Sequence, residues 1–158
     1  MFRELERKNK QITSEECIEI LKNEKRGVLS VIGDDDYPYG MPMNHFYNED
    51  DGCIYFHSGN IGHRLDSLRK NNKVSFCVYD EGTKKEGHWE LHFKSVIIFG
   101  RMEIIDDMDT IVSIVTDLSH KFTADDEYIA REIKGHAHRT LILKLTPENI
   151  CGKKVTES

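Results

Sequence analysis

The segment that most restricts the fold of this 158-residue chain is an apolar strand that breaks at a polar turn and continues as a short helix. The strand pattern starts at Cys53, and Ser58-Gly59-Asn60 interrupts it. Around the expected helix start, apolar residues at helical spacing would bury one stripe against a sheet, namely Ile61, Leu65 and Leu68. The segment therefore predicts a strand-to-helix junction packed on a sheet.

The first turn of this helix has the features of an anion site. A helix start exposes unpaired backbone N–H groups and the positive end of the helix dipole. Gly59 and Gly62 let a ligand approach the backbone closely, and Arg64, beside His63, can bind a phosphate through two hydrogen bonds. Glycines near an arginine also occur in ordinary surface turns. Taken alone, the segment leaves both interpretations open, a phosphate site and a surface turn.

The rest of the chain is predicted to be mainly β with peripheral helices. A capping box at Thr13-Ser-Glu-Glu16 starts a helix that ends near residue 23, and two more helices are expected at about 106–118 and 125–134. Gly100 predicts a β-bulge, and Pro147 is expected to end the last strand. The strand patterns cover residues 27–32, 39–47, 53–56, 74–79, 89–105 and 141–145. Six strands with short turns predict a small barrel and not a βαβ sheet.

Length and charge restrict the function without naming it. The chain is long enough for one domain with its own core, so we expect a single domain over residues 1–158. A formal net charge of −6 argues against a nucleic-acid partner. The N-terminus is charged and no apolar run approaches the length of a membrane span. We therefore expect a cytoplasmic protein with no membrane partner.

No metal site is predicted. The four cysteines are scattered without C-x-x-C or metal-type spacing, and we expect them to be reduced. His88 and His92 lie four apart, but Trp89 leads into a strand, where the two would not converge as they do on a helix. His136 and His138 lack an identifiable third ligand. A dinucleotide or P-loop glycine motif is also absent from the sequence.

Four sequence pieces occur in an order and spacing that resemble a known family: Arg26-Gly-Val-Leu-Ser-Val-Ile-Gly33, Tyr39-Gly-Met-Pro-Met-Asn44, Ile54-Tyr-Phe-His-Ser58 running into His63-Arg64, and Ser95-Val-Ile-Ile-Phe-Gly-Arg101. The chain resembles the flavin-binding split β-barrel family that includes pyridoxamine 5′-phosphate oxidase. Within it, the chain is most similar to the nitroimidazole-resistance (Nim) type proteins. The resemblance covers about residues 16–153. It implies a six-stranded split β-barrel of the FMN-binding type that works as a homodimer, with FMN at the subunit interface.

The resemblance also assigns cofactor-binding positions. Arg64 matches the basic residue that holds the FMN phosphate, and His63 stands where relatives often have arginine, within the turn that includes Ser58 and Gly62. A histidine carries a firm charge only when protonated, so phosphate affinity would depend on pH. The strand along the isoalloxazine ring is matched by Met41, Pro42, Met43 and Asn44. Lys94 and Ser95 match positions at which the partner subunit, or the opposite wall of the site, usually contacts the flavin. For Met41 and Met43, alternating core positions are an equal alternative.

His57 is the one candidate catalytic residue. It ends an apolar strand just before the phosphate turn, and in the Nim-like subgroup a histidine at this place faces the flavin. This makes it a candidate proton donor or substrate-orienting group. The alternative is a histidine that only caps the strand or packs under the cofactor.

The function implied by the resemblance is an FMN-dependent oxidoreductase that passes electrons from reduced flavin to a small planar acceptor, nitroaromatic or quinone-like. Pyridoxamine phosphate oxidase itself is a poorer match, because the only tryptophan is Trp89 and the chain end lacks a substrate-binding tail of that enzyme's type. Three alternatives remain: a non-catalytic flavin carrier or sensor, a haem-binding split barrel with His57 or His138 as axial ligand, and a barrel without a cofactor.

Overall fold

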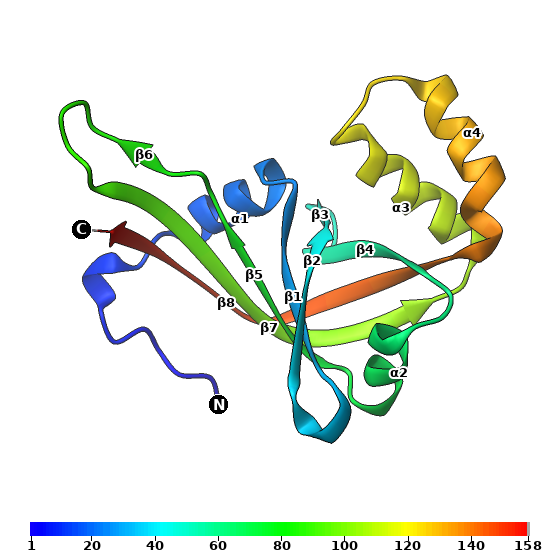
Figure 1. Cartoon of the computed structure of the whole chain (residues 1–158), viewed down its shortest axis with the longest axis horizontal. Helices are drawn as coiled ribbons and strands as arrows, with labels where there is room; N and C mark the ends of the chain where they lie inside the picture. Colours follow the sequence, from blue (N-terminus) through cyan, green and yellow to red (C-terminus); the bar gives the residue numbers. More distant parts are fainter. Residues whose placement is uncertain (158) are drawn as a thin grey trace.

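The computed structural model describes residues 1–157, and its centre is one strongly curved antiparallel sheet (Figure 1). Neighbouring strands follow the order β2-β1-β5-β7-β8-β4-β3, and β6 pairs with β7 alone. The described residues contain eight strands: β1 (Arg26–Ile32), β2 (Pro38–Asn44), β3 (Phe46–Asn48), β4 (Cys53–Gly59), β5 (Lys73–Tyr79), β6 (Thr83–Lys84), β7 (Leu91–Ile105) and β8 (Thr140–Glu157). The prediction of a mainly β chain is confirmed, with eight strands in place of the six expected.

Helices lie around this sheet and carry the predicted caps (Figure 1). The Thr13 side chain accepts a hydrogen bond from the Glu16 N–H at 3.2 Å, which confirms Thr13 as the N-cap residue, and Asp107 and Asp125 cap two later helices in the same way. The reciprocal bond of the predicted capping box is not formed, because Glu16 Oε2 lies 3.3 Å from Lys94 Nζ instead. None of the helices within residues 1–157 is long and apolar enough to cross a membrane. The helices are α1 (Ser14–Asn23), α2 (His63–Lys70), α3 (Met108–His120) and α4 (Asp126–His136), with 3₁₀ turns η1 (Lys8–Lys10), η2 (Asp34–Asp36) and η3 (Ala137–Arg139).

The two edge strands of the sheet, β2 and β3, are consecutive in the chain and meet at His45. The prediction of one strand over residues 39–47 is wrong, because β2 pairs with β1 whereas β3 pairs with β4 at the opposite edge. The break lies at His45 because its fully buried ring donates from Nε2 to the Leu21 carbonyl oxygen at 2.8 Å. In addition, Lys121 Nζ donates to the His45 carbonyl oxygen at 2.6 Å. The sheet therefore curls back on itself as a half-barrel.

The longest ladder of the sheet joins β7 to β8 and contains the predicted bulge. The register shifts between Phe99 and Gly100, and Pro147 lies opposite Gly100. The prediction that Pro147 ends the last strand is therefore wrong, since β8 continues to Glu157. A bulge interrupts the ladder hydrogen bonds, so a residue without an N–H is tolerated there.

Two apolar cores lie on opposite faces of β4. The larger one fills the half-barrel and includes Phe56 together with Leu21 of α1. The smaller one joins Tyr55 to Ile142 of β8 and to the apolar side of α3. Successive side chains of a strand point to opposite faces. Ser58, like Phe56, therefore faces the half-barrel, whereas His57 faces the same side as Tyr55.

The helix after β4 packs on the larger core through Leu65 and Leu68, which are both buried. Ile61 does not extend this stripe as predicted, because its side chain is 86% exposed. It precedes the N-cap residue Gly62 and so lies outside the first helical turn. Ser67 is the third buried residue of α2.

Candidate functional site

The junction between β4 and α2 leaves a helix start open to a ligand. Gly62 is the N-cap residue of α2 and has φ 136°, a backbone conformation that favours glycine. Among the described residues, no side chain caps this helix, so the N–H groups of its first turn stay unpaired. The turn predicted from the sequence is therefore in place.

Arg64 lies in the first turn of α2 and reaches back over β4 and β2. Its Nη2 donates to Ser58 Oγ at 2.8 Å, and its Nη1 donates to Met43 Sδ at 3.0 Å and lies 3.7 Å from Met41 Sδ. The Ser58 hydroxyl in turn donates to the carbonyl oxygen of Gly59 at 2.9 Å. Residues of two strands, β4 and β2, therefore contact one guanidinium of α2.

The charge of Arg64 is not neutralised by the chain. No carboxylate within residues 1–157 forms an ion pair with it, and its Nε–H is buried without a hydrogen-bond partner. Burial lowers the pKa of the guanidinium, and the neighbouring Tyr39 opposes this shift. A half-buried cation beside the free N–H groups of a helix start fits a phosphate group.

His63 is turned towards the β1–β2 hairpin. Its ring stacks on Tyr39, with centroids 4.4 Å apart, and its Nε2 lies 3.6 Å from Asp34 Oδ2. Lys70 at the other end of α2 lies 3.6 Å from the same carboxylate. Sequence reasoning did not single out Tyr39 or Asp34, because only the folded hairpin brings residues 33–39 against α2.

His57 lies on the face of β4 opposite Ser58, and its side chain is exposed. Surrounding protein atoms partly desolvate the imidazole, and together with the charge of Arg64 they lower its pKa. Both effects favour the neutral form of the imidazole. His57 lies one residue from the Arg64–Ser58 contact but on the other side of the strand.

The four predicted flavin-contacting residues of β2 divide between its two faces. Met41 and Met43 are buried in the larger core and face Arg64. Pro42 and Asn44 point to the other face, where Arg26 Nε donates to Asn44 Oδ1 at 3.3 Å. The core positions of the two methionines are therefore confirmed, whereas their contact with a flavin stays a prediction.

Lys94 and Ser95 lie on β7, which is three strands away from β2 in the sheet. Three strand spacings correspond to about 14 Å. Ser95 is buried, and Lys94 Nζ lies 3.3 Å from Glu16 Oε2 on α1. No hydrogen bond or ion pair between described residues joins Lys94 to Arg64.

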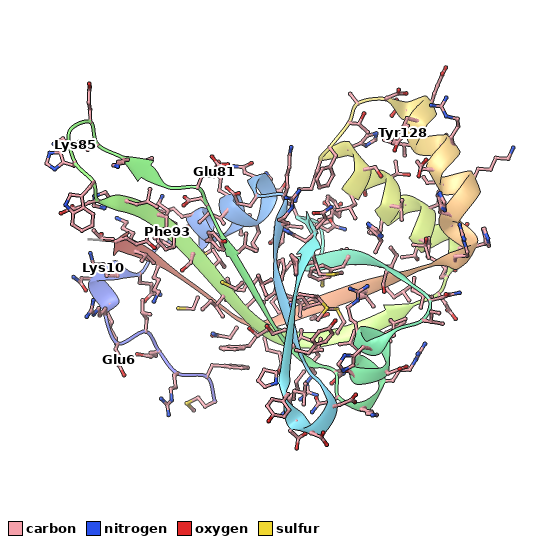
Figure 2. The ribbon with its side chains drawn as sticks, viewed as in Figure 1. Glu6, Lys10, Glu81, Lys85, Phe93 and Tyr128 are labelled. Carbon is pink, nitrogen blue, oxygen red and sulfur yellow. The ribbon has the colours of Figure 1, made fainter. Side chains whose placement is uncertain are left out.

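A wide groove lies beside Lys94 and is not lined by Arg64. It has a volume of about 1150 Å³ and separates the projecting β6–β7 arm from α1 and the start of β1. Figure 2 shows Phe93, Glu81 and Lys10 around it. Pro42 also lines the groove. The outer face of β2, the strand that carries the two methionines, therefore borders it.

Metal-binding residues do not gather anywhere in the described part of the chain. Among residues 1–157, no three His, Cys, Asp or Glu side chains lie close enough together to hold a metal ion. All four cysteines are free.

A curled antiparallel half-barrel, with a strand that runs through a tight turn into a short helix, is consistent with a split β-barrel. The chain belongs to the pyridoxamine 5′-phosphate oxidase family, whose sequence profile matches residues 13–154. The predicted fold class and family are confirmed. No curated protein matches the sequence.

Solved structures with the same fold include proteins with different assignments. A protein assigned to 5-nitroimidazole antibiotic resistance from Bacteroides thetaiotaomicron is 20% identical, with a TM-score of 0.76 over 92% of this chain and 87% of that one. An FAD-binding protein from Mesorhizobium loti is also 20% identical, with a TM-score of 0.69 over 92% and 96% of the two chains. An FAD and haem binding protein from Mycobacterium smegmatis is 19% identical, with a TM-score of 0.74 over 94% and 74%.

Proposed function

We propose that this protein binds FMN and works as an oxidoreductase that passes electrons from the reduced flavin to a small planar acceptor, nitroaromatic or quinone-like. The observation that carries the proposal is the Arg64 guanidinium, half-buried beside a helix start and without a carboxylate partner. A free cation of this kind is costly to bury unless a ligand anion meets it. Membership of the family and the flavin-binding relatives support the choice of a flavin phosphate as that anion.

The chain offers groups for each part of the cofactor. The first turn of α2, with Gly62, His63 and Arg64, would hold the phosphate, and Ser58 would keep the guanidinium in place. Backbone groups of residues 41–44 on β2 would lie along the ring system. When bound, the flavin supplies the electron transfer itself. The protein contributes binding, orientation and the exclusion of water.

His57 is proposed to orient the acceptor. The lowered pKa favours the neutral imidazole, which can donate a hydrogen bond without adding a second positive charge next to Arg64. The same shift makes it a weak candidate for a charged proton donor. We therefore assign it an orienting role at the edge of the site.

We propose further that the functional unit is a homodimer with the cofactor between its subunits. Lys94 and Arg64 do not meet within one chain, so a site that uses both would take Lys94 from a second copy. The outer face of the sheet also carries an uncharged row that crosses five strands and contains Pro42, Val28, Cys77, Ile97 and Cys151. A continuous apolar row on an exposed sheet face is suited to an interface.

The test starts with an absorbance and fluorescence titration of the purified protein with FMN, and with riboflavin in parallel. We expect a bound flavin spectrum and tighter binding of FMN than of riboflavin. The loaded protein is then reduced chemically without oxygen and mixed with a nitroaromatic or a quinone. Reoxidation faster than that of free reduced FMN supports the oxidoreductase, whereas no binding of FMN refutes the proposal.

The outcomes also separate the alternatives. A non-catalytic carrier or sensor would bind FMN but show no multiple turnover with NAD(P)H and an acceptor. A haem-binding barrel would give an intense sharp absorption band in place of the flavin spectrum, and one relative is described as binding both FAD and haem.

A further inference from the structure

The Arg64 guanidinium is oriented by neutral acceptors instead of a carboxylate. Its Nη2 donates to the Ser58 hydroxyl at 2.8 Å and its Nη1 donates to the Met43 thioether at 3.0 Å. A thioether sulfur is a weak acceptor and carries no charge. This combination holds the side chain in one direction and leaves its positive charge intact.

A carboxylate in the same place would have a different effect. It would form a strong charge-assisted pair with Arg64 and compete with an incoming phosphate for the same N–H groups. A wholly apolar surrounding would leave the long side chain free to adopt many rotamers, which lowers affinity because ordering it on binding costs entropy. Two methionines on one face of β2 avoid both problems.

We propose that Met43, assisted by Met41, is a positioning residue for Arg64, and that its thioether sulfur presents the guanidinium to the flavin phosphate. This inference rests on the proposed function, because it assigns Met43 a part in phosphate recognition. The strand geometry brings both sulfurs to this side of β2. Residues 41 and 43 are two apart, so their side chains point to the same inward face, and both are buried. Methionine suits the place because its flexible side chain also fills the core.

A core role alone would make a different prediction. Leucine has nearly the same volume as methionine, so Met43→Leu keeps the packing and removes only the acceptor. Met102 offers a matched control, since it is buried in the same core but its sulfur is not among the described acceptors of Arg64 hydrogen bonds. Met102→Leu therefore makes the same replacement of methionine by leucine in the core but leaves the hydrogen bonds of Arg64 in place.

The experiment measures the ratio of riboflavin to FMN dissociation constants, which isolates the contribution of the phosphate. We expect Met43→Leu to lower this ratio by about 3- to 10-fold, the range of one neutral hydrogen bond, with riboflavin affinity unchanged. Met102→Leu should leave the ratio at the wild-type value. In an Arg64→Met background, Met43→Leu should have no further effect, because the two residues act as one unit.

A second probe does not depend on flavin. Inorganic phosphate should raise the melting temperature of the wild-type protein, and less so that of Met43→Leu. If the wild type binds no FMN but its phosphate shift depends on Met43, the proposed function is wrong and the positioning role stands. If Met43→Leu keeps both the wild-type ratio and the wild-type phosphate shift, the positioning role is wrong.

Discussion

Replacing Arg64 with methionine removes the one cation at the start of α2 while keeping a side chain of similar length. The guanidinium can form two charge-assisted hydrogen bonds to a phosphate, each with a net value of about 1.5–3 kcal/mol. The site is only half-buried, so solvent and salt screen it and the lower value is appropriate. Two bonds then sum to about 3 kcal/mol, which corresponds to a roughly 100-fold weaker FMN affinity.

The assay is the same fluorescence titration with FMN and riboflavin, at low and at high salt. Arg64→Met should weaken FMN binding and leave riboflavin binding unchanged, and the difference from wild type should shrink as salt rises. Arg69→Met is the matched control, because Arg69 lies on the same helix but is exposed and 3.7 Å from Asp66. It should bind both ligands as the wild type does.

The apoprotein gives an independent check on the same reasoning. Arg64 is partly buried without an anionic partner, so its loss should not lower the melting temperature of the ligand-free protein. With FMN present, the variant should lose the stabilisation that the ligand provides. Wild-type FMN affinity in Arg64→Met, or an equal loss for FMN and riboflavin, would refute the phosphate assignment.

Three further predictions concern stability and assembly. His45 is buried with a pKa lowered to about 3, so below about pH 6.5 the unfolded chain binds a proton at this residue that the folded chain does not bind. The free energy of unfolding should therefore fall as the pH drops below about 6.5, by up to ~1.4 kcal/mol per pH unit, and urea titrations should show a shallower loss in His45→Gln. Ile97→Asp should convert the proposed dimer to a monomer in light-scattering measurements, whereas Val112→Asp on the exposed side of α3 should not. An unchanged molecular mass for Ile97→Asp would contradict the proposed interface. Gly100→Ala should lower the free energy of unfolding in urea by about 1–3 kcal/mol, because the added Cβ would overlap the backbone of β8. Gly135→Ala, in open space on α4, should be neutral or stabilising, and equal effects of the two substitutions would contradict the predicted overlap.

Local signals in the sequence predicted the elements that depend on neighbouring residues. Thr13 caps the helix through the Glu16 N–H because the two residues lie within one helical turn. Residues 74–79 were predicted as a strand from their local pattern, and burial alternates along β5 because a strand face repeats every second residue. Gly100 indicated the bulge because a glycine inside a strand pattern is a local signal for one.

Long-range pairing decided what the local signals missed. Pro147 reads as a strand end, but its place opposite the bulge at Gly100 removes the need for its N–H. The local pattern of residues 39–47 predicts one strand, but two hydrogen bonds interrupt it at His45. The buried His45 ring donates to the Leu21 carbonyl of α1, and Lys121 after α3 donates to the His45 carbonyl. These partners lie 24 and 76 residues away, so no window of sequence around His45 contains them.

The sequence by itself determined the strand-to-helix junction, the glycine at its turn and the arginine that follows, because these are properties of about ten consecutive residues. Only the tertiary structure decided what surrounds that arginine. It brought Met41 and Met43 from β2 to the guanidinium, placed Tyr39 and Asp34 against His63, and kept every carboxylate within residues 1–157 out of ion-pairing range of Arg64. The physical reason is that a charge is tuned by its neighbours in space, and the curl of the sheet selects those neighbours.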